Sequence, residues 1–451
     1  MSGYAEYREV NLPWLKAVPA HWEIRRNKNI FTEQKEIVGE RSADYTLLSL
    51  TLNGIILRDM DGGGKFPESF DKYKIVKNGD MAFCLFDIDE TPRTVGLSGY
   101  NGMLTGAYTI MRVSNINARF IYYYYLALDN GKMLRPLYTG LRKTININTF
   151  QSTKVPVPPR EEQDQIVRFL DWKVSSINKL INIKKKEIKA IDALKRSTVS
   201  HAITRGLTAD APMKYSGVKW LGDIPQRWYT VPLYAIAQVK SINNCIDLPL
   251  MSVYLDAGVV PFVEREEKRT NATSKDLTNY QRVDPGDFVL NNQQAWRGSV
   301  GVSFHSGIVS PAYIVLSLNN TLDSHYANYL FRSRCMVDQY LVISRGVGSI
   351  QRNLYWSALK RVVVPIPSKK EQMEIVEYLD GLNNKFDATI KKLTEEVAVL
   401  EEYKNKIIAD IVTGKIDVRG IEIPEYEFVD EDNDNVDENL EQGADEPPEE
   451  E

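Results

Sequence analysis

Two pairs of segments carry side chains that can form paired hydrogen bonds with the edges of nucleobases. In the second half of the chain, residues 291–298 are rich in Asn and Gln and contain one Arg, and residues 344–353 supply Arg and Ser. In the first half, residues 87–94 and 140–146 supply Arg, Lys and Thr. Arg pairs with guanine, and Asn or Gln with adenine, so these segments have the chemistry of base reading. A surface loop without a ligand is the alternative for each.

Catalytic motifs are missing from the sequence. The Asn/Asp-Pro-Pro-aromatic motif of adenine methyltransferases does not occur, and Gly62–Lys65 lacks the earlier glycine and the following Ser or Thr of a phosphate-binding loop. The four histidines show no metal-ligand spacing; they are His21, His201, His305 and His325. We therefore expect no catalytic residue and no metal site.

The charge of the chain is unevenly distributed. The net charge is −4, yet the segment from Gly420 to Glu451 has no Lys or Arg and 15 Asp or Glu. Without it, 56 basic residues face 45 acidic ones. The folded part is therefore basic, as expected for a protein that binds nucleic acid. We expect the acidic end to form a disordered tail.

The cysteines and the hydropathy indicate the cellular compartment. Cys84, Cys245 and Cys335 are far apart in sequence, which is typical of buried thiols in a reducing cytosol. No run of about 18 apolar residues occurs, and the first ten residues are polar. The sequence predicts a soluble, cytoplasmic protein with no membrane partner.

The chain contains two divergent copies of one unit, offset by 203 to 209 residues. So many ordered matches would hardly arise by chance. The matched segments are Val18–Trp22 with Ile224–Trp228, Tyr73–Asp80 with Tyr280–Asp287, Val95–Ser98 with Val300–Ser303, and Val155–Pro158 with Val364–Pro367.

The first part of each copy has the pattern of short strands separated by Gly, Asn, Asp and Ser turns, followed by a helix with aromatic residues. We expect Trp22 and Trp228 to be packing anchors and Tyr122–Tyr125 to lie in the core. The predicted strands are 45–52, 80–86, 108–113, 248–255, 287–290 and 313–318, and the predicted helices are 120–128 and 325–331.

The second part of each copy is predicted to be a long helix. Apolar residues recur about every 3.5 residues, as in a coiled-coil seam. The seam of the second copy runs from Leu379 to Ile411 and includes Tyr403, and that of the first runs from Ile166 to Ile203 and includes Leu194. Lys184 and Lys195 lie near the first seam. Pro158-Pro159 and a Ser368–Glu371 capping box mark the helix starts, and Gly206 and Gly414 mark the ends.

These elements predict the fold class. We expect an α+β protein with two β-rich domains separated by a long antiparallel two-helix coiled coil, because neither apolar seam can stay in water. Antiparallel pairing would relate the two copies by an internal pseudo-twofold repeat. Such an arrangement suits a DNA site in two parts.

From its first residues to about Arg419, the sequence resembles the specificity subunit of Type I restriction-modification systems. The resemblance is carried by the Val-Pro-x-x-Trp segment, the Gly-Asp strand motif, the Gly-Ile-x-Ser-Pro-x-Tyr element at Gly307–Tyr313, and the doubled Pro-x-Pro-x-x-Glu-Gln helix start. It implies target-recognition domains at 1–158 and 207–367, spacer helices at 159–206 and 368–414, and an acidic tail at 415–451.

The resemblance also implies the partners and the division of labour. Each domain would read one half of an asymmetric, interrupted site on double-stranded DNA. The helices would set the half-site spacing and dock two methyltransferase subunits, and restriction/translocase subunits would join the complex. The chain itself would hold no cofactor, and S-adenosylmethionine, ATP and Mg²⁺ would be bound by the partners.

The resemblance places DNA contacts on the four segments described first. Most Lys and Arg contacts should be to phosphate. The candidate DNA-binding residues are Arg93, Arg142, Lys143, Thr144, Asn292, Gln293, Gln294, Arg297, Arg345, Ser349 and Arg352.

Three alternatives stay open from the sequence. The chain could serve as the DNA-recognition subunit of a fused methyltransferase-nuclease, it could itself be an enzyme, or it could be a structural coiled-coil tether. A tether is disfavoured because it needs no basic, amide-rich loops.

Overall fold

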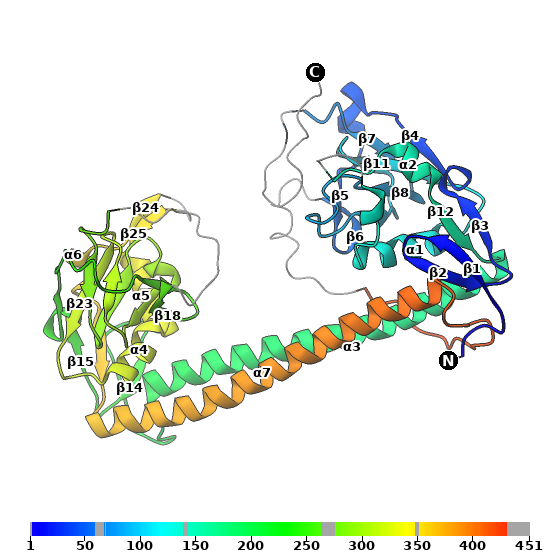
Figure 1. Ribbon diagram of the computed structural model, residues 1–451. Helices are drawn as coiled ribbons and strands as arrows, with labels where there is room; N and C mark the ends of the chain where they lie inside the picture. The colour runs from blue at the N-terminus through cyan, green and yellow to red at the C-terminus, as the bar shows by residue number, and fades with distance from the viewer. Residues whose placement is uncertain are drawn as a thin grey trace. The chain divides into compact units, whose positions relative to one another are not determined.

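The computed structural model describes residues 2–58, 67, 69–138, 143–262, 276–347 and 351–430. The chain divides into two compact units: unit 1 comprises Met1–Glu187 and Leu393–Glu451, and unit 2 comprises Ile188–Lys392. Each unit contains one β-rich body and a section of both long helices (Figure 1). Within the described ranges, no helix is both long and apolar enough to span a membrane.

The body of unit 1 is built from short strands and two helices, followed by the first long helix. Its strands are β1 Tyr7–Leu12, β2 Leu15–Pro19, β3 Glu23–Arg26, β4 Phe31–Gln34, β5 Leu48–Thr51, β6 Gly54–Leu57, β7 Lys74–Val76, β8 Asp80–Phe83, β9 Val95–Leu97, β10 Gly102–Leu104, β11 Thr109–Val113 and β12 Lys154–Val157. Its helices are α1 Ala118–Asn130, α2 Ile147–Ser152 and α3 Arg160–Arg205, the last of which continues into unit 2.

The body of unit 2 repeats this order and adds a helix and a hairpin. Its strands are β13 Met213–Tyr215, β14 Asp223–Pro225, β15 Tyr229–Pro232, β16 Ala237–Val239, β17 Met251–Tyr254, β18 Gly258–Pro261, β19 Gln281–Val283, β20 Asp287–Asn291, β21 Val300–Val302, β22 Gly307–Val309, β23 Tyr313–Leu318, β24 Arg345–Val347, β25 Gln351–Asn353 and β26 Val363–Ile366. Its helices are α4 Ser324–Arg332, α5 Arg334–Ile343, α6 Trp356–Leu359 and α7 Lys369–Val412, the last of which continues into unit 1.

The sheets of the two units have the same strand order. The four-stranded sheet β4-β11-β8-β9 of unit 1 corresponds to β16-β23-β20-β21 of unit 2, and both are antiparallel throughout. Four two-stranded ladders also correspond: β1-β2 with β13-β14, β12-β3 with β15-β26, β5-β6 with β17-β18, and β10-β7 with β19-β22. The mixed helix and strand content confirms the predicted α+β class.

Each central sheet packs against the aromatic helix that follows it. In unit 1, Tyr123, Tyr124 and Tyr125 of α1 are buried with Phe83 of β8, as predicted for the tyrosine run, whereas Tyr122 is only partly buried. In unit 2, Phe331 of α4 stacks on Phe288 of β20 with 4.1 Å between ring centroids. The N-caps match as well, because Asn117 and Asp323 each accept two backbone N–H groups of the helix they begin.

In unit 1 the first section of α3 packs along the last section of α7. Ile166, Leu170 and Ile177 share one apolar core with Ile407 and Ile411. The helices run in opposite directions, because Lys404 donates to Asn178 while Lys184, further along α3, pairs with Glu396, which is earlier in α7. The hydrogen bond to Glu396 raises the pKa of Lys184.

In unit 2 the last section of α3 packs along the first section of α7, with Ile203 beside Ile375 and Leu379 in one core. Lys195 pairs with Asp387 at 2.5 Å. Two seam positions differ from the prediction, since Leu194 is 55% exposed and Tyr403 in unit 1 is 43% exposed. Lys195, which pairs with Asp387, directly follows Leu194, and the pair of Lys184 and Glu396 also joins the two helices.

The segment after α7 was expected to belong to a disordered tail, and residues 415–430 differ from this expectation. They lie against α3 of unit 1, where Gln165 donates to the carbonyls of Val418 and Ile421, and Val418 is fully buried. The polar side chains of α3 accept and donate to this backbone, which is why an acidic segment can stay on the helix. Residues 431–451 lie outside the described residues.

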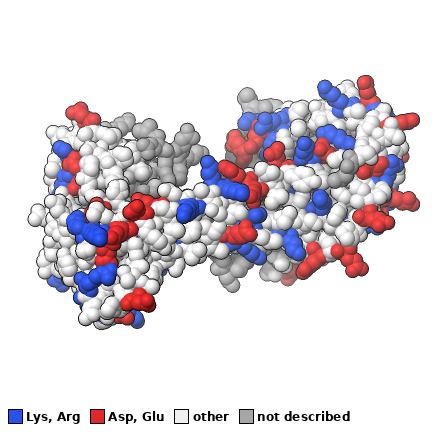
Figure 2. Space-filling view, turned by 90° about the horizontal axis from the view of Figure 1, so that it is seen from below, with Lys and Arg blue, Asp and Glu red and all other residues white. Residues whose placement is uncertain are grey.

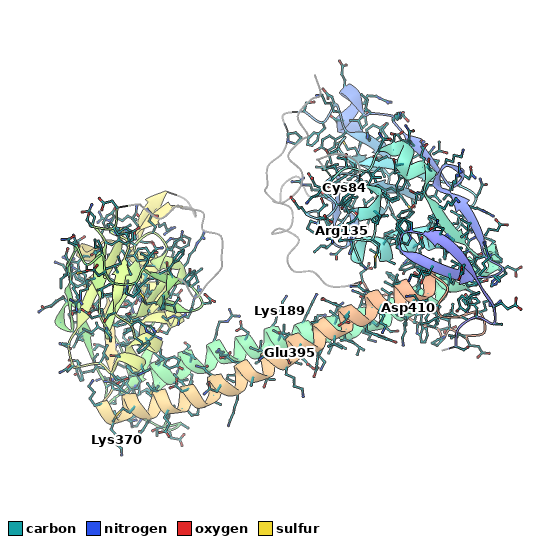
Figure 3. The ribbon with its side chains drawn as sticks, in the orientation of Figure 1. Cys84, Arg135, Lys189, Lys370, Glu395 and Asp410 are labelled. Atoms are coloured by element: carbon teal, nitrogen blue, oxygen red, sulfur yellow. The ribbon has the colours of Figure 1, made fainter. Side chains whose placement is uncertain are left out.

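Two of the three cysteines are buried as predicted. Cys84, labelled in Figure 3, and Cys335 are buried, and burial raises the pKa of the Cys84 thiol to about 11. The prediction is wrong for Cys245, which is only partly buried. It lies in the loop after β16, where neighbouring residues such as Ile242 and Ile246 are exposed.

Candidate nucleic-acid interface

The amide-rich segment of unit 2 forms a compact turn at the end of β20. The side chain of Asn291 accepts from the backbone N–H of Gln293 at 3.2 Å, and the N–H of Gln294 donates to the carbonyl of Asn291 at 3.0 Å. A short 3₁₀ helix, Ala295–Arg297, follows and ends at Gly298, whose φ of +110° favours glycine. The turn leaves Gln293 and Arg297 exposed, and it leaves Asn292 and Gln294 half-buried.

Trp296 joins this turn to the hairpin β24-β25. The guanidinium of Arg297 lies 4.7 Å from the centre of the indole, and that of Arg352 from β25 lies at 5.8 Å. The backbone N–H of Leu354 also donates to the carbonyl of Asn292 at 2.9 Å. The structure thus brings together Asn292, Arg297 and Arg352, which are up to 60 positions apart in the chain.

One further predicted residue of unit 2 lies in the hairpin. Arg345 begins β24 and is exposed, so its guanidinium can reach a ligand without rearrangement of the core. Ser349 lies outside the described residues. The cations of Arg297 and Arg352 against an indole form a positively charged surface with an aromatic face, which suits contact with nucleic acid.

The corresponding surface of unit 1 is acidic as well as basic. Asp89 accepts from Arg135 at 2.6 Å and from the hydroxyl of Tyr138 at 3.0 Å. Lys143 lies 3.9 Å from Asp89 and 3.7 Å from Glu90, so the structure brings the two predicted segments of this unit together. The hydrogen bond from Arg135, which Figure 3 labels, lowers the pKa of Asp89. Unit 1 therefore has a charge network where unit 2 has amides.

Lys143 and Thr144 follow a stretch that is not described. Arg142 lies outside the described residues. Lys143 is half-exposed and has a φ of +49°, which places it in a left-handed turn, and Thr144 next to it is half-buried. The N–H of Ile145, directly after them, donates to the carbonyl of Leu85 at 2.8 Å.

That contact has a counterpart in unit 2. Leu85 follows β8 as Asn292 follows β20, and Ile145 corresponds to Leu354 in the repeat, so both units make the same backbone hydrogen bond between their two candidate loops. The backbone framework is shared, whereas the side chains at its centre differ, with Leu85 in unit 1 and Asn292 in unit 2.

Arg93 is held inside unit 1. Its guanidinium donates to the buried Asp129 at 3.0 Å and to Asn130 at 2.7 Å, and the side chain is only 15% exposed. Base reading by Arg93 would require this ion pair to open. DNA contact by Arg93 stays a prediction, and the structure gives the residue a second role, because it links the segment after β8 to the end of α1.

Three residues of these surfaces were not singled out from the sequence. Trp296 lies in the amide-rich segment, and an aromatic residue directly before an Arg was the available signal. Arg135 and Tyr138 flank a Pro-Leu pair and become part of the site only through Asp89, which is 46 positions away from Arg135. No local pattern marked that pairing.

The charge on the surface is mixed. On the face drawn in Figure 2, Lys and Arg side chains alternate with Asp and Glu over the described residues of both units. Positive charge is thus not gathered into one patch on this face. Among the described residues, no group of three or more His, Cys, Asp and Glu could hold a metal ion.

The two units thus share one strand order and differ in the side chains of their candidate loops. The model of the family "Type I restriction modification DNA specificity domain" matches residues 70–191 and 225–399, once in each half of the chain. The match covers more than half of the 451 residues, so the chain belongs to this family and is a DNA sequence-recognition subunit.

Relatives agree over nearly the whole length. The chain is 24% identical over 442 residues to the Type I restriction enzyme MjaVIII specificity subunit of Methanocaldococcus jannaschii, which covers 92% of this chain and 98% of that protein. It is 25% identical over 435 residues to the putative MjaX specificity subunit of the same organism, which covers 89% and 95%. A solved structure described as a complex assembly and conformational transition study of a Type I system has a TM-score of 0.59 at 15% identity, and covers 88% of this chain and 99% of that one.

Proposed function

We propose that the chain reads an asymmetric DNA sequence in two parts, one half-site by each unit, without catalytic activity of its own. The observation that supports this most directly is the pair of equivalent hydrogen bonds, Ile145 to Leu85 and Leu354 to Asn292. These bonds hold different side chains in the same backbone arrangement. Two recognition units with the same backbone but different side chains should read two different half-sites, so the full DNA site would not be a palindrome.

The domain boundaries that follow from this proposal are 1–158 and 207–367 for the recognition domains, 159–206 and 368–414 for the spacer helices, and 415–451 for the acidic C-terminal region. The two helices would form one antiparallel coiled coil that relates the domains by a pseudo-twofold axis. The opposite direction of α3 and α7 in unit 1 supports this arrangement. The length of the helices would then fix the spacer between the half-sites.

The partners follow from the family. Two methyltransferase subunits would dock on the helices, and restriction/translocase subunits would join them. S-adenosylmethionine, ATP and Mg²⁺ would be bound by those partners, because this chain shows no motif for any of them. A role as the DNA-recognition subunit of a fused methyltransferase-nuclease is not favoured, because the relatives that match nearly the whole chain are named as specificity subunits of Type I restriction enzymes.

The DNA-contacting residues in this proposal are those of the two loop pairs. Gln293, Arg297 and Arg345 are exposed in the described structure, and Lys143 is half-exposed. The candidates are Arg93, Arg142, Lys143, Thr144, Asn292, Gln293, Gln294, Arg297, Arg345, Ser349 and Arg352.

Mapping methylated bases in the host genome, with and without this gene, tests the proposal. We expect a two-part motif with unlike halves that disappears when the gene is deleted. Insertion of one base pair into the spacer of that motif should abolish binding of the chain with its methyltransferase. A palindromic or continuous motif would contradict the proposal. Methyl transfer from labelled S-adenosylmethionine to DNA by the chain alone would show that it is an enzyme.

A further inference from the structure

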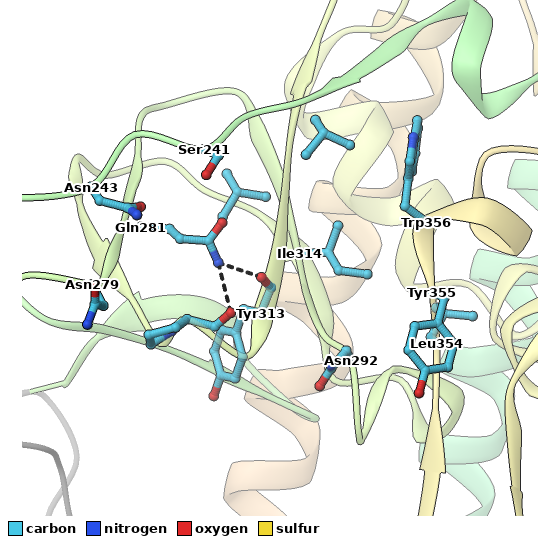
Figure 4. Close-up of a pocket in the computed structure, with 13 residues that line it drawn as sticks. Ser241, Asn243, Asn279, Gln281, Asn292, Tyr313, Ile314, Leu354, Tyr355 and Trp356 are labelled. Carbon is cyan, nitrogen blue, oxygen red and sulfur yellow. Dashed lines mark hydrogen bonds between the residues drawn. The ribbon is translucent and has the colours of Figure 1, made fainter.

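Unit 2 contains a cavity of about 350 Å³ beside the amide-rich turn (Figure 4). Its lining has four amide side chains, three aromatic rings and no charged residue. A volume above about 300 Å³ is in the range of small-molecule sites. The amides are Asn243, Asn279, Gln281 and Asn292, and the rings are Tyr313, Tyr355 and Trp356.

One polar atom of this lining has no partner. The Oδ1 atom of Asn292 is buried and accepts no hydrogen bond from the described residues. By contrast, the amide of Gln281 is used, since it donates to the carbonyl of Tyr313 at 2.6 Å (Figure 4). Burying an amide oxygen without a donor costs free energy, so a rotation of the half-buried Asn292 side chain that brings this oxygen to a donor on a ligand would be favoured.

The aromatic wall is open to an incoming ring. Tyr355 is 52% exposed and Trp356 is half-buried, and Val239 is also half-exposed. All three line the cavity, as does Asn292. A planar ligand could therefore lie against apolar and aromatic surface while its edge faces the amides.

Unit 1 differs at the same places of the repeat. Leu85 replaces Asn292, and Lys74 replaces Gln281 while keeping its contact, because the Nζ of Lys74 donates to the carbonyl of Tyr108 at 2.7 Å. Glu33 and Lys35 on or beside β4 stand where unit 2 has Val239 and Ser241 next to β16. Charged residues of unit 1 thus stand at places of the repeat where the cavity of unit 2 has neutral residues.

The chemistry of the lining selects the class of ligand. A phosphate site needs Lys, Arg or several backbone N–H groups, and this cavity has no charged side chain. A neutral planar ring with donors and acceptors on its edge fits both the amides and the rings. We propose that this cavity binds one nucleobase of the half-site read by unit 2, a base that has rotated out of the DNA stack.

This inference rests on the proposed function. Asn292 would pair with the edge of the base, and an amide pairs best with adenine, whose N6 donates and whose N7 accepts. The Oδ1 atom that is unpartnered in the free chain would receive the N6 proton. Tyr355 and Trp356 would replace the stacking that the base loses when it leaves the duplex.

The test uses the full chain, without methyltransferase, on the DNA motif mapped from the host genome. The variant is Asn292→Leu, which installs the side chain of unit 1, and the matched control is Asn384→Leu, an exposed Asn on α7 of the same unit. Permanganate oxidation reports thymines whose partner base has left the duplex. Binding to every single-base variant of the motif reports base preference.

We expect the wild-type chain to make one thymine of one half-site reactive to permanganate. Asn292→Leu should remove that reactivity and lower the preference for the cognate base at this position by about tenfold or more. The other half-site should be read as before, and Asn384→Leu should behave as wild type. Tyr355→Phe, which keeps the ring, should retain the reactivity, and Tyr355→Ala should lose it.

Four results would overturn the inference. If the wild-type chain binds its motif and no thymine becomes reactive, the base does not leave the stack, although the proposed function stands. An unchanged base preference in Asn292→Leu would show that Asn292 does not pair with a base of the motif, although the proposed function would again stand. If adenosine quenches the fluorescence of Trp356 in the wild-type chain but not in a Trp356→Phe chain, while the DNA readouts stay silent, the cavity binds a free nucleoside instead of DNA. Failure of the wild-type chain and its methyltransferase to bind the motif at all would remove both proposals.

Discussion

The indole Nε1 of Trp228 donates to the Oε2 of Glu371 at 2.9 Å, and both residues are buried. The pair recurs in unit 1, where Trp22 donates to Glu162 at the same distance. Each bond joins the segment that follows the first two strands of a β-rich body to the first turn of a long helix. Arg227 also contacts Glu371, and this hydrogen bond raises the pKa of Arg227. The body and its helix are thereby held in one orientation.

Replacement of Glu162 by Ala should destabilise unit 1. Its carboxylate accepts from Trp22, from the hydroxyl of Tyr4 at 2.6 Å and from His21 at 2.8 Å, and Tyr4 and Trp22 are buried. Loss of the carboxylate leaves two buried donors unpaired, which costs about 2–4 kcal/mol of unfolding free energy. Urea unfolding measures the change. The neighbouring exposed Glu161→Ala should change it by less than about 0.5 kcal/mol, and equal losses in the two variants would contradict the assignment.

The sequence predicted the long helices well. α3 and α7 begin within one residue and end within two residues of the expected ranges, because a seam of apolar residues bounded by Pro and Gly is a strong signal. Of the eight strands in the two central sheets, β8, β11, β20 and β23 were predicted, with β23 at the expected bounds, whereas β4, β9, β16 and β21 were not. The helix α5 was also missed, because a short apolar run does not distinguish helix from strand, and the hairpin β24-β25 was missed because its strands are short and mostly polar.

Contacts made by long-range pairing could not be predicted. The capping box at Ser368 is half-formed: its hydroxyl accepts from the N–H of Glu371 at 3.3 Å, but the carboxylate of Glu371 binds Trp228 and Arg227 instead. Arg93 was selected for its chemistry, and only the fold reveals Asp129 as its partner. Residue type indicates what a side chain can bind, while the tertiary structure decides which groups are already taken.

Replacement of Asp89 by Asn should strengthen binding of unit 1 to DNA. Arg135 donates to Asp89, and Lys143 lies near it. The pKa of Asp89 is lowered, so it stays charged until the pH falls below the ordinary range near 3.9 and partly neutralises these cations in any binding buffer. Removing its charge should free a cation for one more phosphate, with roughly fivefold tighter binding at about 100 mM salt and a steeper salt dependence.

Fluorescence anisotropy with labelled DNA at several salt concentrations measures this effect. The matched control is Asp44→Asn, an exposed Asp in the 3₁₀ helix Gly39–Asp44, which should bind as wild type. Base preference should not change in either variant, because phosphate contacts carry no sequence information. Weaker binding by Asp89→Asn at an unchanged unfolding midpoint would show that Asp89 orients its neighbours for contact instead of competing with DNA.

Truncation after Arg419 should destabilise unit 1 and leave unit 2 unaffected. Ser175 donates to the carbonyl of Glu427 at 3.1 Å and accepts from the N–H of Val429 at 2.8 Å, and Asn182 donates to the carbonyl of Asp430 at 2.9 Å. Loss of these contacts should cost about 1–3 kcal/mol. Hydrogen exchange should become faster in the first section of α3 and stay unchanged in β20 and β23.

Truncation after Asp430 is the matched control, because it removes acidic residues 431–451 and keeps the contacts to α3. We expect its unit 1 to be as stable as that of the full chain. If the chain that ends at Arg419 and the chain that ends at Asp430 had equally stable unit 1 bodies, residues 420–430 would contribute nothing to the stability of unit 1.

Replacement of Arg345 by Ala, and separately of Arg142 by Ala, should weaken DNA binding. Arg345 is exposed at the start of β24, in the hairpin whose Arg352 contacts Trp296 of the amide-rich turn, and Arg142 lies outside the described residues. If either contacts phosphate, affinity falls equally for cognate and altered sequences and the salt slope decreases by about 1. If it reads a base, the loss is confined to one position of one half-site.

Arg334→Ala is the control, since Arg334 is 77% exposed on α5 and pairs locally with Asp338. If affinity and salt dependence stay unchanged in both variants, the loops at 140–146 and 344–353 do not lie in the DNA interface. The amide-rich turn around Trp296 would then have to make the DNA contact of unit 2 alone.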